Sequence, residues 1–334
     1  MNFQENIKFA IVGATGIVGL EFLKILEKEN VLSNKIIVAA SKNSVGSKLK
    51  YKNDFLIVED LEEVDFSNCK IGLFSPGAKV SEIYAPIAEK QGCFVIDNTS
   101  FFRTHEDVPL IVPEINLEEL KNAKRKIIAN PNCSTIQLVM VLKPIQDICK
   151  IKRVFVSTYQ SVSGAGKDAL GELNDENTNS EKNVIFPQKI KKNVIPKIDT
   201  FLSSGETKEE WKMFVETRKI LNSDIVVSST CVRVPVEVGH SEAVFFELEH
   251  DVPIKEIHEA IRKFPGVYIE DLDSNEFKTP REIAGTDEVF VSRLRKDENT
   301  KCCYQMWIVA DNVRKGAALN AVQIAKGLVS YGIV

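Results

Sequence analysis

Apolar and polar positions in the first third of the chain alternate between short apolar runs and longer amphipathic stretches. Short runs rich in β-branched and aromatic residues are typical of strands buried on both faces, and apolar positions spaced by three and four indicate helices. We expect strands at residues 8–12, 35–40, 55–58, 71–74 and 94–97 and helices at 20–28 and 80–91. Because strands that alternate with helices form parallel sheets, this order predicts an α/β fold with a Rossmann-type, doubly wound nucleotide-binding domain.

From residue 151 the pattern changes to the two-residue alternation of half-buried strands. The expected elements are strands at 154–160, 225–234, 242–249, 289–295 and 303–310 and a helix at 254–264. Such alternation is typical of antiparallel sheets with one face on a core, so we predict an α+β domain with a mainly antiparallel sheet. The segment 174–204, rich in Lys, Asn, Ile and Pro, is interpreted as an irregular excursion.

The apolar tail of the chain extends the first of these two domains. Residues 316–331 are rich in Ala, Leu, Val and Ile, which predicts a helix that packs back on the nucleotide-binding domain. We therefore place that domain at 1–132, completed by 314–334, and the second domain at 133–313. A chain of 334 residues is long enough for two domains of the usual size.

A glycine-rich turn joins the first strand to the first helix. It reads Gly13-Ala14-Thr15-Gly16-Ile17-Val18-Gly19, a GxxGxxG spacing that departs from the GxGxxG fingerprint. Glycines in such a turn let the backbone approach a pyrophosphate, which then lies at the helix N-terminus. The turn is a candidate dinucleotide site, and the alternative is a tight turn without a ligand.

The end of the second strand bears on the choice of cofactor. A dinucleotide fold usually places an acid there to bind the ribose 2′-OH, but this chain has Ser41-Lys42-Asn43-Ser44. Hydroxyls, an amide and a cation suit a 2′-phosphate, so the sequence favours NADP over NAD. A solvated loop with an incidental lysine is the alternative.

A cysteine follows the last strand of the first domain. The run Asn130-Pro131-Asn132-Cys133-Ser134-Thr135 comes between an apolar strand at 127–129 and an apolar helix, which places Cys133 at a helix N-terminus. Free N–H groups and the positive dipole end lower a thiol pKa there, so Cys133 is a candidate nucleophile. The alternative is a small core cysteine that begins a helix.

Composition narrows the class of protein. The net charge is −4 and no basic block is interleaved with aromatics, which disfavours a nucleic-acid partner. The polar start at 1–8 and the lack of an apolar run of about 18 residues lead us to expect a cytoplasmic protein without a membrane partner. The seven cysteines have no zinc-ligand spacing, so we expect reduced thiols and no metal site.

Other charged residues are candidates whose structural interpretation remains open. Arg103 follows the strand at 94–97 and could bind a phosphate, or be an ordinary surface arginine. Glu216 and Lys219 share a helix face, as a solvated ion pair also would. Arg233 and His240 lie in a strand interrupted by proline and glycine, where a histidine is either an acid/base group or structural.

These motifs, taken in order, resemble the aspartate-semialdehyde dehydrogenase family along nearly the whole chain. The resemblance rests on the segments 15–19, 97–103, 130–135, 159–164, 216–219, 239–242 and 311–318, together with Arg233. It implies a nucleotide domain joined to a catalytic and dimerisation domain, the cofactor NADP, a homodimer or homotetramer, and reductive dephosphorylation of L-4-aspartyl phosphate. That reaction belongs to the biosynthesis of lysine through diaminopimelate and of threonine, methionine and isoleucine.

The resemblance also assigns roles to individual residues. It implies that Cys133 is the acyl-enzyme nucleophile, His240 the acid/base and Gln160 the group that orients the acyl substrate. Arg233 would bind the substrate carboxylate, Glu216 its amino group, and Arg103 and Lys219 its phosphate, with Asn132 beside the oxyanion. The cofactor contacts it implies, together with those of the second-strand loop, are Gly13, Thr15, Gly16, Ile17, Val18, Ser41, Asn43, Ser44, Ser163, Gly164 and Asn312. Family members often carry Arg-Ser where this chain has Asn43-Ser44, which weakens the expectation of a strict NADP preference.

Two other functions compete with this prediction. N-acetyl-γ-glutamyl-phosphate reductase shares the fold logic and a cysteine nucleophile. The nitrogen of its substrate is acylated, so a carboxylate such as Glu216, placed to bind an ammonium group, disfavours this function. An NADP-binding redox sensor would use Cys133 as a regulatory thiol and would leave Glu216, Lys219 and Arg233 without a role.

Overall fold

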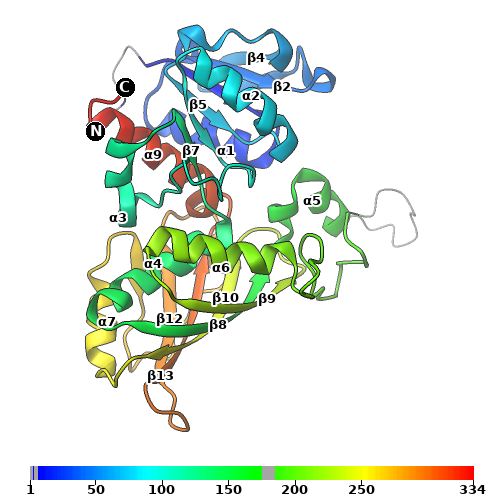
Figure 1. Ribbon diagram of the computed structural model, residues 1–334. Coiled ribbons are helices and arrows are strands. Elements are labelled where there is room, and N and C mark those ends of the chain that lie inside the picture. The colour runs from blue at the N-terminus through cyan, green and yellow to red at the C-terminus, as the bar shows by residue number, and fades with distance from the viewer. Residues whose placement is uncertain (1–2, 4–6, 175–184) are drawn as a thin grey trace. The chain divides into compact units, whose positions relative to one another are not determined.

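The computed structural model describes residue 3 and residues 7–174 and 185–334. Part of the predicted excursion at 174–204 therefore lies outside the described residues. The chain divides into two compact units, one formed by residues 1–131 and 317–334 and the other by residues 132–316 (Figure 1). No helix in the described residues is long and apolar enough to cross a membrane.

The first unit contains a seven-stranded sheet in the order β3-β4-β2-β1-β5-β6-β7. Its strands are β1 (Phe9–Val12), β2 (Ile36–Ala40), β3 (Lys48–Tyr51), β4 (Asp54–Asp60), β5 (Ile71–Phe74), β6 (Phe94–Asp97) and β7 (Ile127–Ala129). All neighbours are parallel except β3 and β4. The predicted Rossmann-type α/β domain is confirmed. The edge strand β3 was not predicted, because its lysines interrupt the apolar pattern.

Helices α1 (Ile17–Lys28), α2 (Ala78–Lys90), α3 (Pro113–Asn116) and α9 (Leu319–Ser330) complete the first unit. α1 begins at Ile17, earlier than the predicted start at residue 20. The C-terminal helix α9 contacts α1 and shares one apolar core with it, through residues such as Phe22 and Ile324 (Figure 1). In addition, the Asn320 amide donates to the Asn130 side chain at 2.7 Å, so the chain's last helix holds the turn that follows β7.

The second unit contains a six-stranded sheet in the order β11-β12-β13-β10-β8-β9. Its strands are β8 (Ile151–Gln160), β9 (Val226–Arg233), β10 (His240–Leu248), β11 (Val267–Ile269), β12 (Val289–Lys296) and β13 (Cys303–Ala310). The pairings β12–β13, β13–β10 and β10–β8 are antiparallel, whereas β8–β9 and β11–β12 are parallel. The sheet is therefore mixed, with an antiparallel centre and parallel pairs at its edges.

Helices cover one face of this sheet and leave aromatic side chains on the other. α4 (Cys133–Ile148), α6 (Lys208–Leu221) and α7 (Ile254–Arg262) contact its strands, while α5 (Lys167–Asn174) and α8 (Pro280–Ile283) are shorter (Figure 1). Along β10, Val244 and Phe246 are buried, whereas Phe245 between them points to the opposite face. There Phe245 contacts Phe155, which is 46% exposed, so this face carries uncovered apolar surface.

Candidate active site

The glycine-rich turn before α1 is shaped by two close backbone approaches. Gly13 has φ +82°, and a Cβ atom there would lie 2.6 Å from the Ser75 carbonyl oxygen. A Cβ atom on Gly19 would lie 2.3 Å from the Gly13 carbonyl oxygen, so only glycine lets α1 pack on the turn. Gly16 is the N-cap of α1 and provides no side-chain cap. The start of this helix can therefore offer backbone N–H groups to an anion.

A pocket of about 540 Å³ adjoins this turn within the first unit. Its lining includes the predicted cofactor residues Gly13, Thr15, Gly16, Ser41 and Asn43. The predicted Ile17 and Val18 are the first residues of α1, and the Ser44 hydroxyl lies 3.5 Å from that of Thr15. These features fit the phosphates and ribose of a dinucleotide.

Two acids that the sequence analysis missed also line this pocket. Asp60 ends β4 and Glu62 follows it, and the Glu62 carboxylate lies 2.6 Å from the Lys42 ammonium. β4 is the parallel neighbour of β2, so the two strands end at the same edge of the sheet. Because the two acids are remote from Lys42 in the sequence, only a prediction that β4 pairs with β2 could have placed them beside this lysine.

Arg103 belongs to the first unit and is buried there. Its Nη2 donates to the Asn98 carbonyl oxygen at 3.0 Å. The preceding strand ends in Asp97, whose carboxylate accepts bonds from the Ser81 and Thr99 hydroxyls at 2.8 Å. The loop that carries Arg103 is thus anchored on a fully buried acid, whose pKa is raised by that burial.

In the second unit, Cys133 is the first residue of α4. Asn132 is the N-cap, and its side-chain oxygen accepts from the backbone N–H groups of Ser134 and Thr135 at 3.0 and 3.3 Å. The predicted helix start is therefore observed. Cys133 itself is partly buried. A Cβ atom on Gly316 would lie 2.9 Å from the Cβ atom of Cys133. The backbone of residue 316 closes one side of the cysteine.

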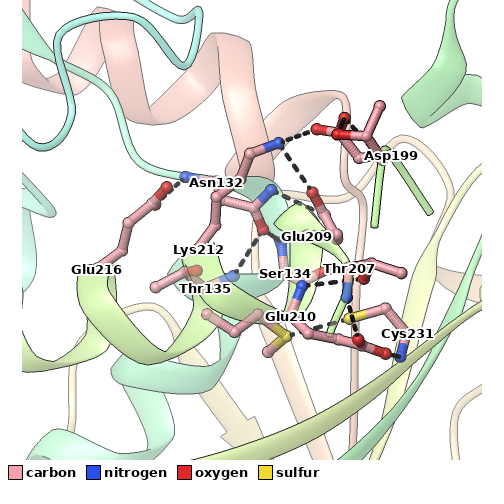
Figure 2. Close-up of polar contacts among 12 residues, drawn as sticks. Asn132, Ser134, Thr135, Asp199, Thr207, Glu209, Glu210, Lys212, Glu216 and Cys231 are labelled. Atoms are coloured by element: carbon pink, nitrogen blue, oxygen red, sulfur yellow. Dashed lines mark hydrogen bonds and ion pairs between the residues drawn. The ribbon is translucent and has the colours of Figure 1, made fainter. Parts of the chain in front are cut away.

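Two carboxylates of α6 accept hydrogen bonds from Asn132 (Figure 2). The Glu216 carboxylate accepts from the Asn132 backbone N–H at 2.6 Å. The Glu209 carboxylate accepts from the Asn132 side-chain amide at 2.9 Å and from the Gln160 amide at 3.3 Å. Glu209 therefore links Asn132 to Gln160, which ends β8. The sequence analysis missed Glu209, because as one of two adjacent acids at a helix start it resembles an ordinary capping residue.

Arg233, which ends β9, has a fully enclosed guanidinium. Its Nη1 donates to the Ser161 carbonyl oxygen at 2.6 Å. The guanidinium carbon lies 5.9 Å from the centre of the Phe186 ring. Burial lowers the pKa of Arg233, while the charges of Glu209 and of the Cys133 thiolate act in the opposite direction. An arginine keeps its charge even so, which leaves a permanent cation close to Cys133.

His240, which begins β10, is completely buried. Its Nδ1 accepts from the Ser161 backbone N–H at 3.1 Å, so in the neutral ring the proton is assigned to Nε2. Burial, reinforced by the charge of Arg233, lowers the pKa of His240 well below its usual value of 6.5. The imidazole is therefore neutral near pH 7. Within the described residues, its Nε2 has no hydrogen-bond partner, which is uncommon for a buried donor and typical of reactive sites.

The remaining predicted residues of the second unit surround this histidine or lie on α6. A Cβ atom on Gly164 would lie 3.0 Å from Arg233 Nη1 and 3.2 Å from the His240 ring, so a side chain at that position would crowd both groups. The Asn312 amide donates to the Ser163 hydroxyl at 3.0 Å, and its oxygen accepts from the Gly239 N–H just before His240. Lys219 lies in the last turn of α6 and is partly exposed.

Comparisons with known proteins show which family this chain belongs to. A model of the semialdehyde dehydrogenase NAD binding domain matches residues 8–123, and one of the semialdehyde dehydrogenase dimerisation domain matches residues 142–315. The aspartate-semialdehyde dehydrogenase of Aquifex aeolicus is 48% identical over 98% of this chain and 99% of its own. This chain belongs to the aspartate-semialdehyde dehydrogenase family. The predicted resemblance is thereby confirmed, and the chain is an enzyme of the oxidoreductase class.

Solved structures of the family agree with this assignment. The aspartate semialdehyde dehydrogenase II of Vibrio cholerae, in a complex with ASA, has a TM-score of 0.92 and 43% identity. The match covers 98% of this chain and 99% of that one. The aspartate-semialdehyde dehydrogenase of Legionella pneumophila is 48% identical in sequence over 97% of this chain and 96% of its own. The match to the family is therefore full-length, in sequence and in fold.

Proposed function

We propose that this enzyme converts L-4-aspartyl phosphate and NADPH to L-aspartate 4-semialdehyde, phosphate and NADP⁺ through a cysteine thioester. The reaction would serve the biosynthesis of lysine through diaminopimelate and of threonine, methionine and isoleucine. One observation carries the proposal: Cys133 opens α4, and the buried Arg233, whose charge interacts with Cys133, shares with His240 the space beside Gly164, where a Cβ atom would lie 3.0 Å from Arg233 and 3.2 Å from His240. This arrangement combines a nucleophile at a helix N-terminus with a cation and an acid/base group.

Cys133 provides the covalent step of the proposed mechanism. Its thiolate attacks the acyl carbon of the substrate, a C–S bond forms, and the C–O bond to phosphate breaks with release of phosphate. The positive end of α4 favours the thiolate and the oxyanion of the tetrahedral intermediate, next to Asn132. His240 is the acid/base group, since the proton on Nε2 can be shared with the intermediate's oxygen and regained afterwards. Gln160 orients the acyl group.

The charges of the substrate match the charges of the candidate residues. A guanidinium binds a carboxylate with two parallel hydrogen bonds, which suits Arg233 for the substrate carboxylate. Glu216 is proposed for the ammonium group, and a carboxylate can accept several bonds, so its contact with Asn132 is compatible with this role. Arg103 and Lys219 are proposed for the phosphate. An N-acylated substrate would have no ammonium group for Glu216 to bind.

The cofactor proposed for this enzyme is NADP, which supplies or accepts the hydride when bound. Its pyrophosphate would lie against the glycine turn at residues 13–18, and Ser41, Asn43 and Ser44 would lie beside the ribose. Lys42 at the edge of the pocket suits a 2′-phosphate, although Glu62 reduces the net charge there. In the second unit, Ser163, Gly164 and Asn312 are proposed as contacts of the nicotinamide end.

We also propose that the enzyme is a homodimer or a homotetramer that buries the uncovered face of the six-stranded sheet. The matched dimerisation-domain model spans every strand of this sheet. The exposed face carries Phe155, Phe245 and Tyr159, an unusual density of aromatic side chains for a solvated surface.

A steady-state assay with L-aspartate 4-semialdehyde, phosphate and NADP⁺ tests the catalytic proposal. We expect phosphate-dependent NADPH formation, and Cys133→Ser should reduce kcat by at least about 10³-fold because the thioester cannot form. Cys302→Ser, in the turn between β12 and β13, is the matched control and should remain active. Turnover by Cys133→Ser at the wild-type rate would refute the mechanism, and lack of any phosphate-dependent turnover by the wild type would refute the function.

A further inference from the structure

Two polar rows lie next to each other on the face of the six-stranded sheet that the helices cover. Paired residues of neighbouring strands point to the same face, so the register of the strands defines each row. In the row proposed for catalysis, Gln160 pairs with Arg233, and His240 lies on the same face of β10. The second row lies two residues away on each strand and consists of Glu242, Thr158 and Cys231.

Glu242 is an acid in this second row to which the proposed mechanism gives no task. Its side chain is completely buried, and neither carboxyl oxygen has a hydrogen-bond partner within the described residues. An ionised carboxylate at such a place would lose its hydration without compensation, which costs far more than burial of the neutral acid. Burial accordingly raises the pKa of Glu242 well above its usual value of 4.5, so the folded chain favours the neutral acid.

The side chain that faces Glu242 is Gln137 of α4. It is equally buried, and its amide oxygen and nitrogen also lack partners in the part of the chain that the structure describes. This amide acts on the Glu242 carboxyl, although no hydrogen bond of full geometry joins the two groups. A neutral carboxylic acid and a primary amide each offer a donor and an acceptor, so the two groups can satisfy each other. A carboxylate could only accept.

This acid–amide pair lies one step away from the proposed catalytic groups on both elements. Glu242 follows His240 by two residues on β10, about 6.7 Å along the strand and on the same face. Gln137 follows Cys133 by four residues on α4, about 6 Å along the axis and on the same side of the helix. Because α4 packs on β10 (Figure 1), a contact between Gln137 and Glu242 fixes the helix of Cys133 against the strand of His240.

We propose that Glu242 and Gln137 are positioning residues that hold Cys133 and His240 at the separation that the thioester chemistry requires. Neither of the two reacts with the substrate. A pair of apolar side chains could fill the same space, but it would not fix the direction of the contact, since dispersion is not directional and a hydrogen bond is. The inference deepens the proposed function and rests on it.

Val244 shows what a residue of the same strand face does by packing alone. It follows Glu242 by two residues, pairs with Val156 of β8 and is buried. Its side chain has no polar atom, so it contributes to the core without a directional contact. Substitution of Val244 therefore provides a control for loss of packing beneath the active site.

Steady-state kinetics of three variants separate positioning from packing. We expect Glu242→Leu to lower kcat about 30-fold and to leave the KM for L-aspartate 4-semialdehyde within about twofold, because the geometry of the chemical step is lost and the binding residues remain. Glu242→Gln keeps a donor and an acceptor and should retain kcat within about threefold. Val244→Ala should lower the midpoint of thermal unfolding and leave kcat unchanged.

Several results of these kinetics would overturn the inference. Glu242→Leu could retain the wild-type kcat, or Glu242→Gln could lose as much as Glu242→Leu. An equal loss of kcat in Val244→Ala would assign the effect to packing.

A double-mutant cycle tests whether Glu242 acts through Gln137. Gln137→Leu should lower kcat about as much as Glu242→Leu, and the double variant should show no further loss, because both substitutions remove the same contact. Losses that multiply in the double variant would show that the two residues act independently and would refute the pair.

The pH dependence of stability tests the protonation state of Glu242. The pKa of this group is raised above 4.5 by folding, so its contribution to stability is complete below that value and is lost as the pH rises towards the native pKa. Glu242→Gln has no such proton, so its midpoint of thermal unfolding should rise relative to the wild type between about pH 5.5 and about pH 8. The difference between Val244→Ala and the wild type should not depend on pH. A pH-independent difference for Glu242→Gln would overturn the neutral acid.

Alkylation of Cys133 by iodoacetamide provides a readout that does not need turnover. Glu242→Leu should lower the rate at Cys133, followed by mass spectrometry, by at least about fivefold, because the thiol moves away from the groups that favour its thiolate. Glu242→Gln should react at the wild-type rate. Cys302, partly buried in the turn between β12 and β13, is the internal control and should react equally in all variants.

An unchanged rate at Cys133 in Glu242→Leu would refute the positioning role. Failure of the proposed function is distinguishable from this result. It would appear as absent turnover by the wild type, while the alkylation of Cys133 still responded to Glu242→Leu.

Discussion

Two helices of this enzyme begin shortly after buried parallel strands, α1 after β1 and α4 after β7, and their starts are built in opposite ways. α1 has glycine at its N-cap, and its geometry depends on the close backbone contacts of Gly13 and Gly19. α4 has Asn132 at its N-cap, and that residue is bonded to two carboxylates from α6. The first start has no side chain at its cap, whereas the second is enclosed by buried polar side chains.

This difference matches two kinds of task. A helix start without a side-chain cap can give its N–H groups to an anion that binds and leaves, as a cofactor pyrophosphate does. A helix start such as that of α4, where the N–H groups of Ser134 and Thr135 already donate to the cap, keeps its dipole, and its field acts on a group fixed in the chain. At α4 that group is Cys133. We therefore propose that the same secondary structure serves cofactor binding in one unit and covalent chemistry in the other.

The largest expected effect comes from replacing the asparagine N-cap of α4 with glycine, the N-cap residue of α1. Asn132→Gly should lower kcat by about 10²-fold, because the contact that fixes residue 132 against Glu209 is lost. The change of cap alone should lower stability by only a few tenths of a kcal/mol, since glycine is a tolerable N-cap, and the lost bond to the buried Glu209 should add about 1 kcal/mol. Steady-state kinetics and thermal unfolding measure the two effects.

The control for Asn132→Gly removes a side-chain cap elsewhere. Asp65 accepts from the Ser67 N–H at 2.9 Å on the surface of the first unit. Asp65→Gly should have only the small effect of the changed cap on stability and no effect on kcat. If Asn132→Gly retained wild-type kcat, the two helix starts would be functionally alike and the contrast between them would be wrong.

The two starts also differ in how far the sequence could predict them. The glycine turn was predictable because its glycines stand between a strand and a helix, and because the approach of Gly19 to the Gly13 carbonyl oxygen is local. The start of α4 was predictable because Asn132 and the strand–turn–helix pattern are local. The contacts of Glu209 with Asn132 and Gln160 were not predictable, since they depend on where α6 is placed against α4, and no local pattern records that placement.

The same reasoning explains the elements that were missed. β3 pairs with β4 at the edge of its sheet, where Lys48 and Lys50 are exposed and conceal the strand pattern. The parallel pairing of β8 with β9 requires a crossover through α6, which alternation within a strand cannot reveal. Asp60 lines the pocket beside the glycine turn because β4 lies next to β2. In each case, the observed structure depends on a segment that is distant in the sequence and adjacent in the fold.

The reverse exchange gives α1 the start of α4, with a smaller expected effect. Gly16→Asn should raise the KM for the cofactor about tenfold, because the new side chain would accept the N–H groups that a pyrophosphate needs. A Cβ atom at this position would lie 3.3 Å from the Gly13 oxygen, a tight contact that a shift of a few tenths of an ångström would relieve. Gly16→Ala adds the same Cβ atom without a hydrogen-bond acceptor and should raise KM less. Equal KM values for the asparagine and alanine variants would show that crowding, not capping, controls cofactor binding.

The smallest expected effect concerns the charges beside the start of α1. Glu62 and Lys42 form an exposed ion pair, with 57% and 66% of their side chains accessible, and such pairs contribute about 0–1 kcal/mol. Glu62→Gln should raise the ratio of kcat/KM for NADP over NAD about threefold, because Lys42 then faces a 2′-phosphate without a competing carboxylate. Glu63→Gln, on the same short turn but outside the pocket lining, is the control and should leave the ratio unchanged. High salt should reduce the difference, since both charges are exposed to solvent. A ratio that does not respond to Glu62→Gln would mean that cofactor choice is made at the glycine turn and the hydroxyls of Ser41 and Ser44, without a contribution from the ion pair.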